Sequence, residues 1–176
     1  NGKLEGANSG LRWGLSIRIF DGLRTVYGYT NEQEEEKILT VIDQLTAAIG
    51  RKRRAECPAI QEQIIQDQHA PEIPVQSVTL AQRRALMQRA NDALLNYDPV
   101  IKKAIVNLAD EDQTVIIASS DGRLVRDNRQ RTRLRMQAVA MDGDRMQNSA
   151  KAPGAHAGYE FYDQIDVEAM ARDAAR

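Results

Sequence analysis

The sequence predicts an α+β fold in two small modules, each made of antiparallel strands packed with amphipathic helices. Three Asp-Gly dipeptides, at 21–22, 121–122 and 142–143, stand between runs with apolar residues in alternation. Gly accepts the positive φ of a tight turn, so an Asp-Gly in this context is typical of a β-hairpin. Apolar residues also recur at helical spacing in residues 31–49 and 79–97. Hairpins combined with such helices indicate the α+β class.

The chain of 176 residues has room for one large core or two small ones, and we predict two. Residues 1–56 form an amino-terminal α/β module, residues 57–78 a linker with three prolines, and residues 79–176 a central α+β module. A strand pair with one helix cannot bury both faces of a sheet, so the first module lacks its first strand and helix. We therefore expect this sequence, which begins without Met, to be a segment of a longer protein.

The composition argues against several classes of protein, among them strongly basic polyanion binders, disulfide-linked proteins and membrane-spanning proteins. The formal net charge is -1 with 28% charged residues, so no overall basic excess indicates a polyanionic partner. Cys57 is the one cysteine, which excludes an internal disulfide and fits a reducing compartment, so we expect the cytoplasm. No apolar run reaches the roughly 18 residues that a membrane helix needs, so we expect no membrane partner.

The first module is expected to contain a hairpin followed by a helix. Residues 11–20 and 23–29 alternate as strands with one buried face. Asn31 with Glu34 forms a variant of the capping box, which predicts a helix start, and Gly50 is the expected stop.

Aromatic residues in these strands could stack on a ligand, but such residues are more often part of the core. We therefore predict that Trp13, Tyr27 and Tyr29 are core residues.

The second module is expected to begin with a helix capped by Thr79 and Gln82 and to continue as a meander. Asp110 to Asp112 is predicted to be a solvated turn rather than a cation site, because it lacks the distal Glu of a calcium loop. The remaining expected elements are a strand over 100–108, a strand over 114–118, a strand over 123–141 interrupted near Asp127-Asn128, a return strand over 145–150, and a helix over 165–175.

The sequence offers no catalytic or metal-binding residue of its own. His69 and His156 are the two histidines, and neither has a second histidine at the spacing of a helical zinc site. Both are expected to be loop residues. Cys57 has no evident histidine partner and is not predicted to be a nucleophile.

A row of arginines is the candidate contact surface. Alternation places Arg129, Arg131, Arg133 and Arg135 on one face of a strand, opposite Leu134, Met136 and Ala138. Such a row can track phosphates, but nucleic-acid readers usually interleave stacking aromatics, which are missing here. We expect the row to face a substrate or a partner protein and not nucleic acid.

Three segments stand out by their order along the chain: residues 1–6 with 14–22 and 27–31, residues 119–122 followed by the arginine strand, and residues 154–161. In this order they resemble the TldD/PmbA family, whose members were once called modulators of DNA gyrase and are regarded as zinc metallopeptidases. The first segment is similar to the family's first domain, the second to its second domain, and the third to the glycine-rich loop that follows. The order of these segments matters more than any single motif.

The resemblance implies the amino-terminal scaffold of a TldD-like zinc metallopeptidase that cleaves unfolded or modified peptides and pairs with a PmbA/TldE-like subunit. The family's His-Glu-x-x-x-His motif and its later cysteine ligand belong to the carboxy-terminal half, and no residue here matches them. This segment would end before the catalytic domain, provide a wall of the substrate chamber and be inactive alone. The alternative is a nucleic-acid-associated, gyrase-modulating module without enzymatic activity. A His-Glu-x-x-x-His motif following Arg176 would favour the peptidase.

Overall fold

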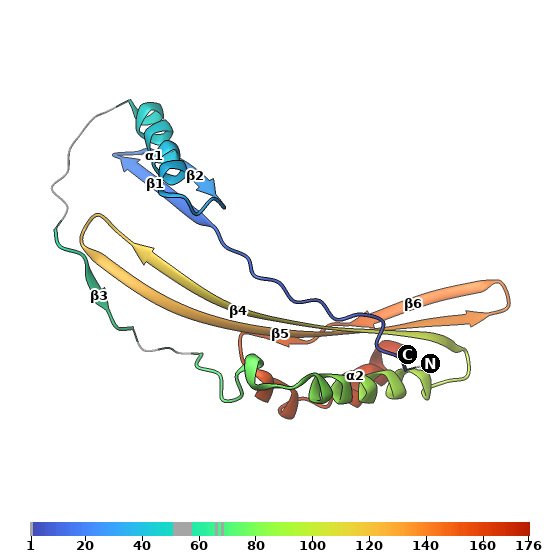
Figure 1. Ribbon diagram of the computed structural model, residues 1–176. Coiled ribbons are helices and arrows are strands. Elements are labelled where there is room, and N and C mark those ends of the chain that lie inside the picture. Colours follow the sequence, from blue (N-terminus) through green and yellow to red (C-terminus); the bar gives the residue numbers. More distant parts are fainter. Residues whose placement is uncertain (1, 51–57, 66, 68) are drawn as a thin grey trace. The chain divides into compact units, whose positions relative to one another are not determined.

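The computed structural model describes residues 2–50, 58–65, 67 and 69–176, and the chain divides into two compact units. The smaller unit comprises Gly6–Glu56, and the larger comprises Asn1–Glu5 with Cys57–Arg176. The described part of the chain contains three α-helices and two sheets, one two-stranded and one five-stranded, so the predicted α+β class is confirmed (Figure 1). None of the described helices is long and apolar enough to cross a membrane.

The smaller unit is a hairpin covered on one face by a helix. Strand β1 (Leu15–Asp21) pairs antiparallel with β2 (Arg24–Thr30), and α1 (Glu35–Ile49) packs against them. The predicted helix stop is confirmed, because Gly50 has φ 75° and its N–H donates to the last carbonyls of α1. The predicted capping box at Asn31 is wrong. The cap position is Glu34, without a side-chain hydrogen bond, and the N–H of Glu32 instead donates to the Thr30 hydroxyl at 3.1 Å.

The expectation that the aromatic residues of this unit form its core is also wrong. Tyr27 is 56% exposed and Tyr29 61% exposed, and Trp13 is 41% exposed. Gly28 lies on the helix side of β2, where a Cβ would stand 2.9 Å from the Leu45 side chain. The single helix therefore packs closely over Gly28, and the tyrosines of β2 point to the opposite face.

The larger unit is built on one long ribbon. Strand β4 (Ile101–Ala118) pairs antiparallel with β5 (Arg123–Asp142), and β5 also pairs with the other three strands of this sheet. Those strands are β3 (Gln61–Gln63, parallel), β6 (Arg145–Lys151) and β7 (Gly154–Ala155). The hairpin turns predicted at 121–122 and 142–143 are confirmed, with positive φ at Gly122 (88°) and Gly143 (58°).

Two predicted breaks in this ribbon do not occur. The expected turn at Asp110 to Asp112 is wrong, because β4 continues through it in register, with Asp110 opposite Thr132. The expected interruption near Asp127-Asn128 is wrong as well, because β5 is continuous. Side chains from elsewhere in the chain pair with these acids, Arg83 with Asp110 and Gln130 with Asp112, which removes the reason for that stretch to form a solvated turn.

Two helices cover one face of the ribbon and form the main core (Figure 1). These are α2 (Leu80–Leu95) and α3 (Val167–Ala175), and α2 begins with the predicted Thr79–Gln82 capping box. Their apolar side chains meet those of β5, and the most completely buried large residues include Leu94, Leu134, Met136 and Val167.

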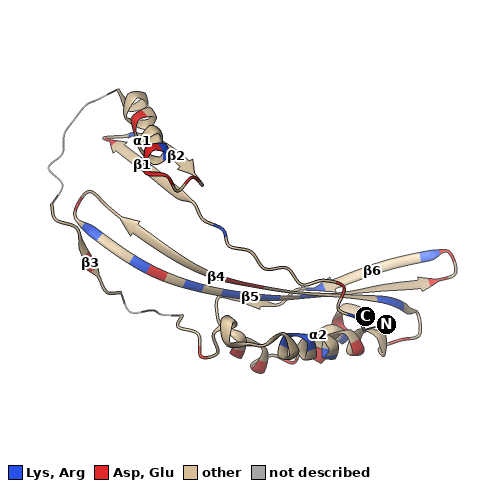
Figure 2. Ribbon diagram, in the orientation of Figure 1, with Lys and Arg blue, Asp and Glu red and all other residues tan. Residues whose placement is uncertain are grey.

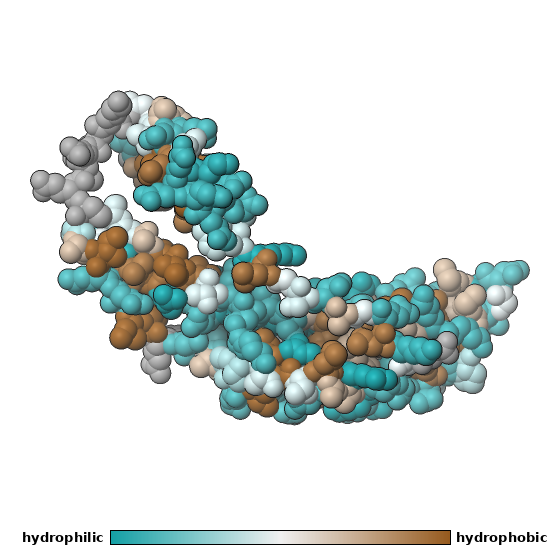
Figure 3. Space-filling model, in the orientation of Figure 1, coloured by the Kyte–Doolittle hydropathy of each residue, from teal (hydrophilic) through white to brown (hydrophobic). Residues whose placement is uncertain are grey.

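Two short 3₁₀ helices border this core, η1 (Val75–Ser77) and η2 (Tyr159–Asp163). The region predicted to be a linker, residues 57–78, contains β3 and η1. Val75 is only 4% exposed, so the end of this region is packed into the larger unit. Near β3 and the β4–β5 turn, in contrast, apolar side chains are exposed (Figure 3), among them Ile60, Ile64, Ile116 and Ile117.

Candidate functional site

The central part of the β4–β5 ribbon has two chemically different faces. Along β5 the residues at even positions from 130 to 138 are buried against the helices, and the arginines between them point outward. A β-strand alternates its side chains in this way, so one segment supplies both the core and a charged surface. Figure 2 shows the basic residues as repeated blue bands along β5.

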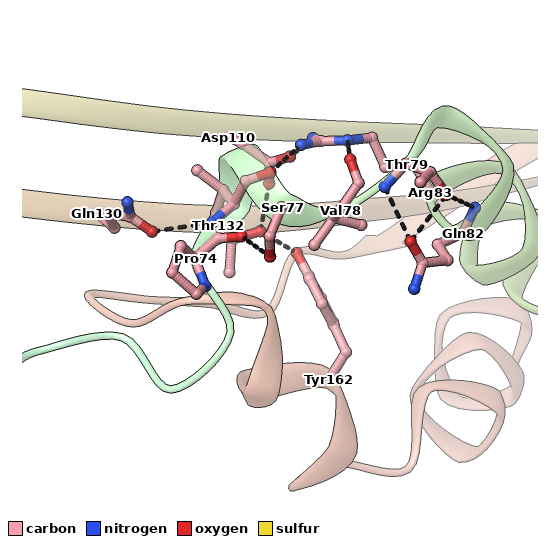
Figure 4. A network of polar contacts seen from close by, with 11 residues as sticks. Pro74, Ser77, Val78, Thr79, Gln82, Arg83, Asp110, Gln130, Thr132 and Tyr162 are labelled. Carbon is pink, nitrogen blue, oxygen red and sulfur yellow. Dashed lines mark hydrogen bonds and ion pairs between the residues drawn. The ribbon is translucent and has the colours of Figure 1, made fainter.

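A buried polar network lies on the helix side of the ribbon (Figure 4). The Arg83 guanidinium forms an ion pair with the Asp110 carboxylate, whose side chain is 8% exposed. The Thr132 hydroxyl donates to Asp110 Oδ1 at 2.6 Å and lies 2.7 Å from the Tyr162 hydroxyl. Burial raises the pKa of Tyr162 to about 12 and so keeps the phenol neutral and able to donate. The network joins α2, β4, β5 and η2.

A second set of polar contacts anchors η1 to the sheet. The Gln130 side chain accepts the backbone N–H of Val75 at 2.9 Å and donates to Gln76 Oε1 at 2.9 Å and Asp112 Oδ1 at 3.2 Å. Gln76 also donates to Asp112. Gln130 is 8% exposed, and these contacts give its amide the hydrogen bonds that a buried polar group requires. We assign both sets a structural role, because they hold the elements that carry the outer face.

The Glu160 carboxylate clamps two loops together. It accepts the backbone N–H groups of Ile73 at 2.9 Å and Gly158 at 2.8 Å, and the Tyr159 N–H donates to the Ile73 carbonyl at 2.8 Å. Burial alone would raise the pKa of Glu160, but the backbone N–H donors outweigh it and lower the pKa below its usual value. The same loops bring the His69 and His156 rings together, with centroids 4.7 Å apart. Sequence spacing gave no sign of this pairing, because the two histidines are far apart in the sequence.

The four predicted arginines lie along the outer face of β5 with different partners. Arg129 pairs with Asp127 at 2.6 Å, Arg131 with Glu111 at 3.3 Å, and Arg135 donates to Gln137 at 3.0 Å. Within the described residues, the Arg133 side chain has no hydrogen bond or ion pair. The assignment of this row to substrate or partner contacts stays a prediction.

A groove of about 500 Å³ opens beside Arg133. Its lining comes from β4, β5 and the chain around β7, and comprises Ala109, Asp110, Glu111, Arg131, Thr132, Arg133, Ala152, Gly154, Ala155 and His156. A Cβ on Gly154 would stand 2.9 Å from the Thr132 carbonyl oxygen and 3.1 Å from Arg133 Cβ, so a glycine is needed for β7 to pass so close. The sequence predicts the arginines but not the groove, because Gly154 and His156 are expected to lie in a loop and no strand is predicted there.

Metal-ligating residues do not gather in the described part of the chain. No group of three or more His, Cys, Asp or Glu side chains there is placed to hold a metal ion. Cys57, which was not predicted to be a nucleophile, lies outside the described residues.

Comparison with known proteins places both units in one family. Residues 1–49 match the model of PmbA/TldA metallopeptidase domain 1, and residues 73–176 match the model of the PmbA/TldA metallopeptidase central domain. A metalloprotease of Methanothermobacter thermautotrophicus is 25% identical over 98% of this chain, and a metalloprotease of Synechocystis is 30% identical over 56% of it. The chain spans only 37% and 22% of the lengths of these two relatives.

Two crystal structures share the fold. A Thermotoga maritima protein described as a candidate modulator of DNA gyrase superposes with a TM-score of 0.68 at 14% identity, covering 99% of this chain and 39% of its own. A Bacteroides thetaiotaomicron protein with a similar description gives a TM-score of 0.68 at 12% identity, over 92% of this chain and 38% of its own. Because the central-domain model alone covers more than half of the residues, the chain belongs to the PmbA/TldD metallopeptidase family.

Proposed function

We propose that this chain is the amino-terminal and central scaffold of a TldD-like zinc metallopeptidase that cleaves unfolded or modified peptides. The observation that carries the proposal is that the family's first and central domains match in order along one chain. The metalloprotease descriptions of the two sequence relatives support it. The scaffold would supply a wall of the substrate chamber, with the arginine row of β5 facing the substrate or a partner subunit.

In this proposal zinc is bound by residues outside this chain, where it would polarise the scissile carbonyl and activate water. The chain's own part is to hold the extended β4–β5 surface rigidly, and the polar network around Asp110 and Gln130 serves that purpose. The partner would be a PmbA/TldE-like subunit, and the expected compartment is the cytoplasm. We expect the isolated chain to cleave no peptide and to bind no zinc stoichiometrically.

The test uses the natural protein that contains this chain, in parallel with the 176-residue chain itself. Zinc content and cleavage of an unfolded polypeptide are measured for both, with and without a PmbA/TldE-like subunit. We expect chelator-sensitive cleavage by the complete protein and none by the isolated chain. A complete protein that is inactive under all these conditions, or an isolated chain that holds one zinc through dialysis, contradicts the proposal.

The second candidate function is a nucleic-acid-associated module without enzymatic activity. It is favoured by the gyrase-modulator descriptions of the two structural neighbours and by the row of arginines. The acidic side chains of Glu111 and Asp127 pair with members of that row and disfavour a polyanion. Binding to a single strand and a duplex at physiological salt distinguishes the two functions, because a phosphate-binding surface weakens steeply as salt increases.

A further inference from the structure

The groove beside β7 combines three features that no structural role of the chain explains. It is open, it is lined by Arg133, whose side chain pairs with no described side chain, and its second arginine, Arg131, has only the exposed Glu111 carboxylate as a partner. The Arg131 and Glu111 side chains are 49% and 58% exposed and 3.3 Å apart, which is a weak surface pair that an incoming carboxylate can rearrange.

We propose that this groove binds an acidic side chain of an extended peptide, with Arg133 as the residue that recognises the carboxylate. The inference rests on the proposed function, since it assigns a peptide to the chamber wall. A guanidinium presents two parallel N–H donors that match the two oxygens of a carboxylate, and such bidentate pairs are among the stronger hydrogen bonds of proteins.

The geometry of the strand favours a peptide as the occupant. Arg131 and Arg133 are two residues apart on one face of β5, so their Cα atoms are separated by about 6.5–7 Å. Alternate side chains of an extended peptide have the same spacing. A peptide lying along β5 with acidic residues at alternate positions can therefore place one carboxylate at Arg133 and the next near Arg131.

The charges around the groove favour separate carboxylates over a continuous polyanion. Glu111 lines the groove, and Asp127 neutralises Arg129 further along the same face. A phosphate backbone tracking β5 would meet both acids. The groove lining also contains no Phe, Tyr or Trp on which a base could stack.

Gly154 gives the site its shape. Its missing side chain lets β7 lie against the Thr132 carbonyl and the first carbons of the Arg133 side chain. His156 lines the same groove. The nearby Gly158 N–H donates to Glu160 and the His156 ring lies against the His69 ring, so contacts within the chain position this wall of the groove.

The experiment measures peptide binding by the full chain with fluorescence anisotropy, which requires neither zinc nor cleavage. The probes are a fluorescein-labelled Ala-Glu-Ala-Glu-Ala peptide and its counterpart with Gln at both Glu positions. Three variants are compared with the unmodified chain: Arg133→Ala, Arg133→Lys and Arg145→Ala. Arg145 is an exposed arginine of the same sheet outside the groove, so it controls for net charge. Circular dichroism confirms that each variant is folded.

We expect the Glu peptide to bind about tenfold more tightly than the Gln peptide. Arg133→Ala should remove that preference, Arg133→Lys should keep part of it because the charge remains without the planar fork, and Arg145→Ala should leave it intact. Equal binding of both peptides, an equal loss in Arg145→Ala, or displacement of the Glu peptide by a DNA oligonucleotide at lower concentration than by unlabelled Glu peptide overturns the inference.

The outcome separates the inference from the proposed function. If the complete protein cleaves peptides but the Glu preference does not depend on Arg133, only the inference fails. If the preference depends on Arg133 but the complete protein cleaves nothing, the groove remains an acidic-peptide site and the proposed function fails.

Discussion

The side chain of Gln130 accepts the backbone N–H of Val75 at 2.9 Å and thereby fixes η1 to the middle of β5. Val75 is 4% exposed and Gln130 8% exposed, so water cannot supply an equivalent hydrogen bond to the Val75 N–H if the Gln130 side chain is removed. Together with the Gln76–Asp112 hydrogen bond, this amide holds η1 against the sheet.

Replacing Gln130 with Ala should destabilise the larger unit by about 1–3 kcal/mol, because the Val75 N–H and the Asp112 carboxylate each lose a partner. Chemical denaturation of the variant measures the change. Gln113→Ala is the matched control, since Gln113 is exposed on the other face of the ribbon. Equal midpoints for the two variants would contradict the anchoring role of Gln130.

Neighbouring acids of β4 should differ sharply in their contribution to stability. Asp110 is 8% exposed in its pair with Arg83, whereas Glu111 is 58% exposed in its pair with Arg131. We expect Asp110→Ala to cost about 3 kcal/mol or more, because it leaves a guanidinium without its partner in a largely buried site. Glu111→Ala should change the stability by less than about 1 kcal/mol. Denaturant titrations of both variants test the difference, and similar losses would show that Asp110 is not buried as described.

The Glu160 clamp should make the larger unit sensitive to acid. The backbone N–H donors lower the pKa of Glu160 below its usual value, so the clamp's stabilisation is complete above that usual value and is lost as the pH falls through the lowered pKa. Glu160→Gln should be less stable than the unmodified chain at pH 7, and this difference should narrow as the pH falls through the lowered pKa of Glu160. Melting curves of both proteins from pH 7 to pH 3 provide the measurement. A difference in stability between the two proteins that increases in acid would contradict the stabilising role of the ionised Glu160 carboxylate.

Gly122 should be the least replaceable of the turn glycines. Its φ is 88°, and a Cβ there would also stand 3.1 Å from the carbonyl oxygen of Ala59 and from Pro58 Cγ. Gly122→Val should cost about 1–2 kcal/mol or more, because a β-branched residue is strained at positive φ. Gly10→Val is the control, since a Cβ at Gly10 would meet no atom within 4 Å. Thermal melts in which both variants retain the unmodified midpoint would contradict the strain.

Local rules predicted those parts of the fold that depend on a few neighbouring residues. The hairpins at Gly22, Gly122 and Gly143 follow from glycine at positive φ between alternating runs. The helix start at Thr79 follows from a reciprocal pair of hydrogen bonds with Gln82. None of these features needs a distant partner.

The predictions that were wrong concern residues whose structure depends on distant parts of the chain. The sequence predicts a turn at Asp110 because its partner, Arg83, is far away in the sequence. In the structure the ion pair with Arg83 neutralises the Asp110 carboxylate, and a strand forms there. Tyr27 is predicted to be a core residue because alternation identifies the two faces of a strand but not the face that a helix covers. The structure exposes it. The candidate site divides in the same way. Alternation predicted the arginine row, but the groove needs β7, whose place beside β5 depends on Gly154.

Strand β5 pairs with β3, β4, β6 and β7, so an insertion or a deletion within β5 affects the pairing of the whole sheet. One extra residue near Arg131 would turn every later side chain of β5 to the other face, sending Leu134 and Met136 to solvent and arginines toward the helices. Two extra residues would preserve the alternation and shift only the pairing. Length variation within β5 should therefore be confined to even numbers of residues or to a bulge, while the β5–β6 turn, where Gly143 has open space around it, can vary freely in length.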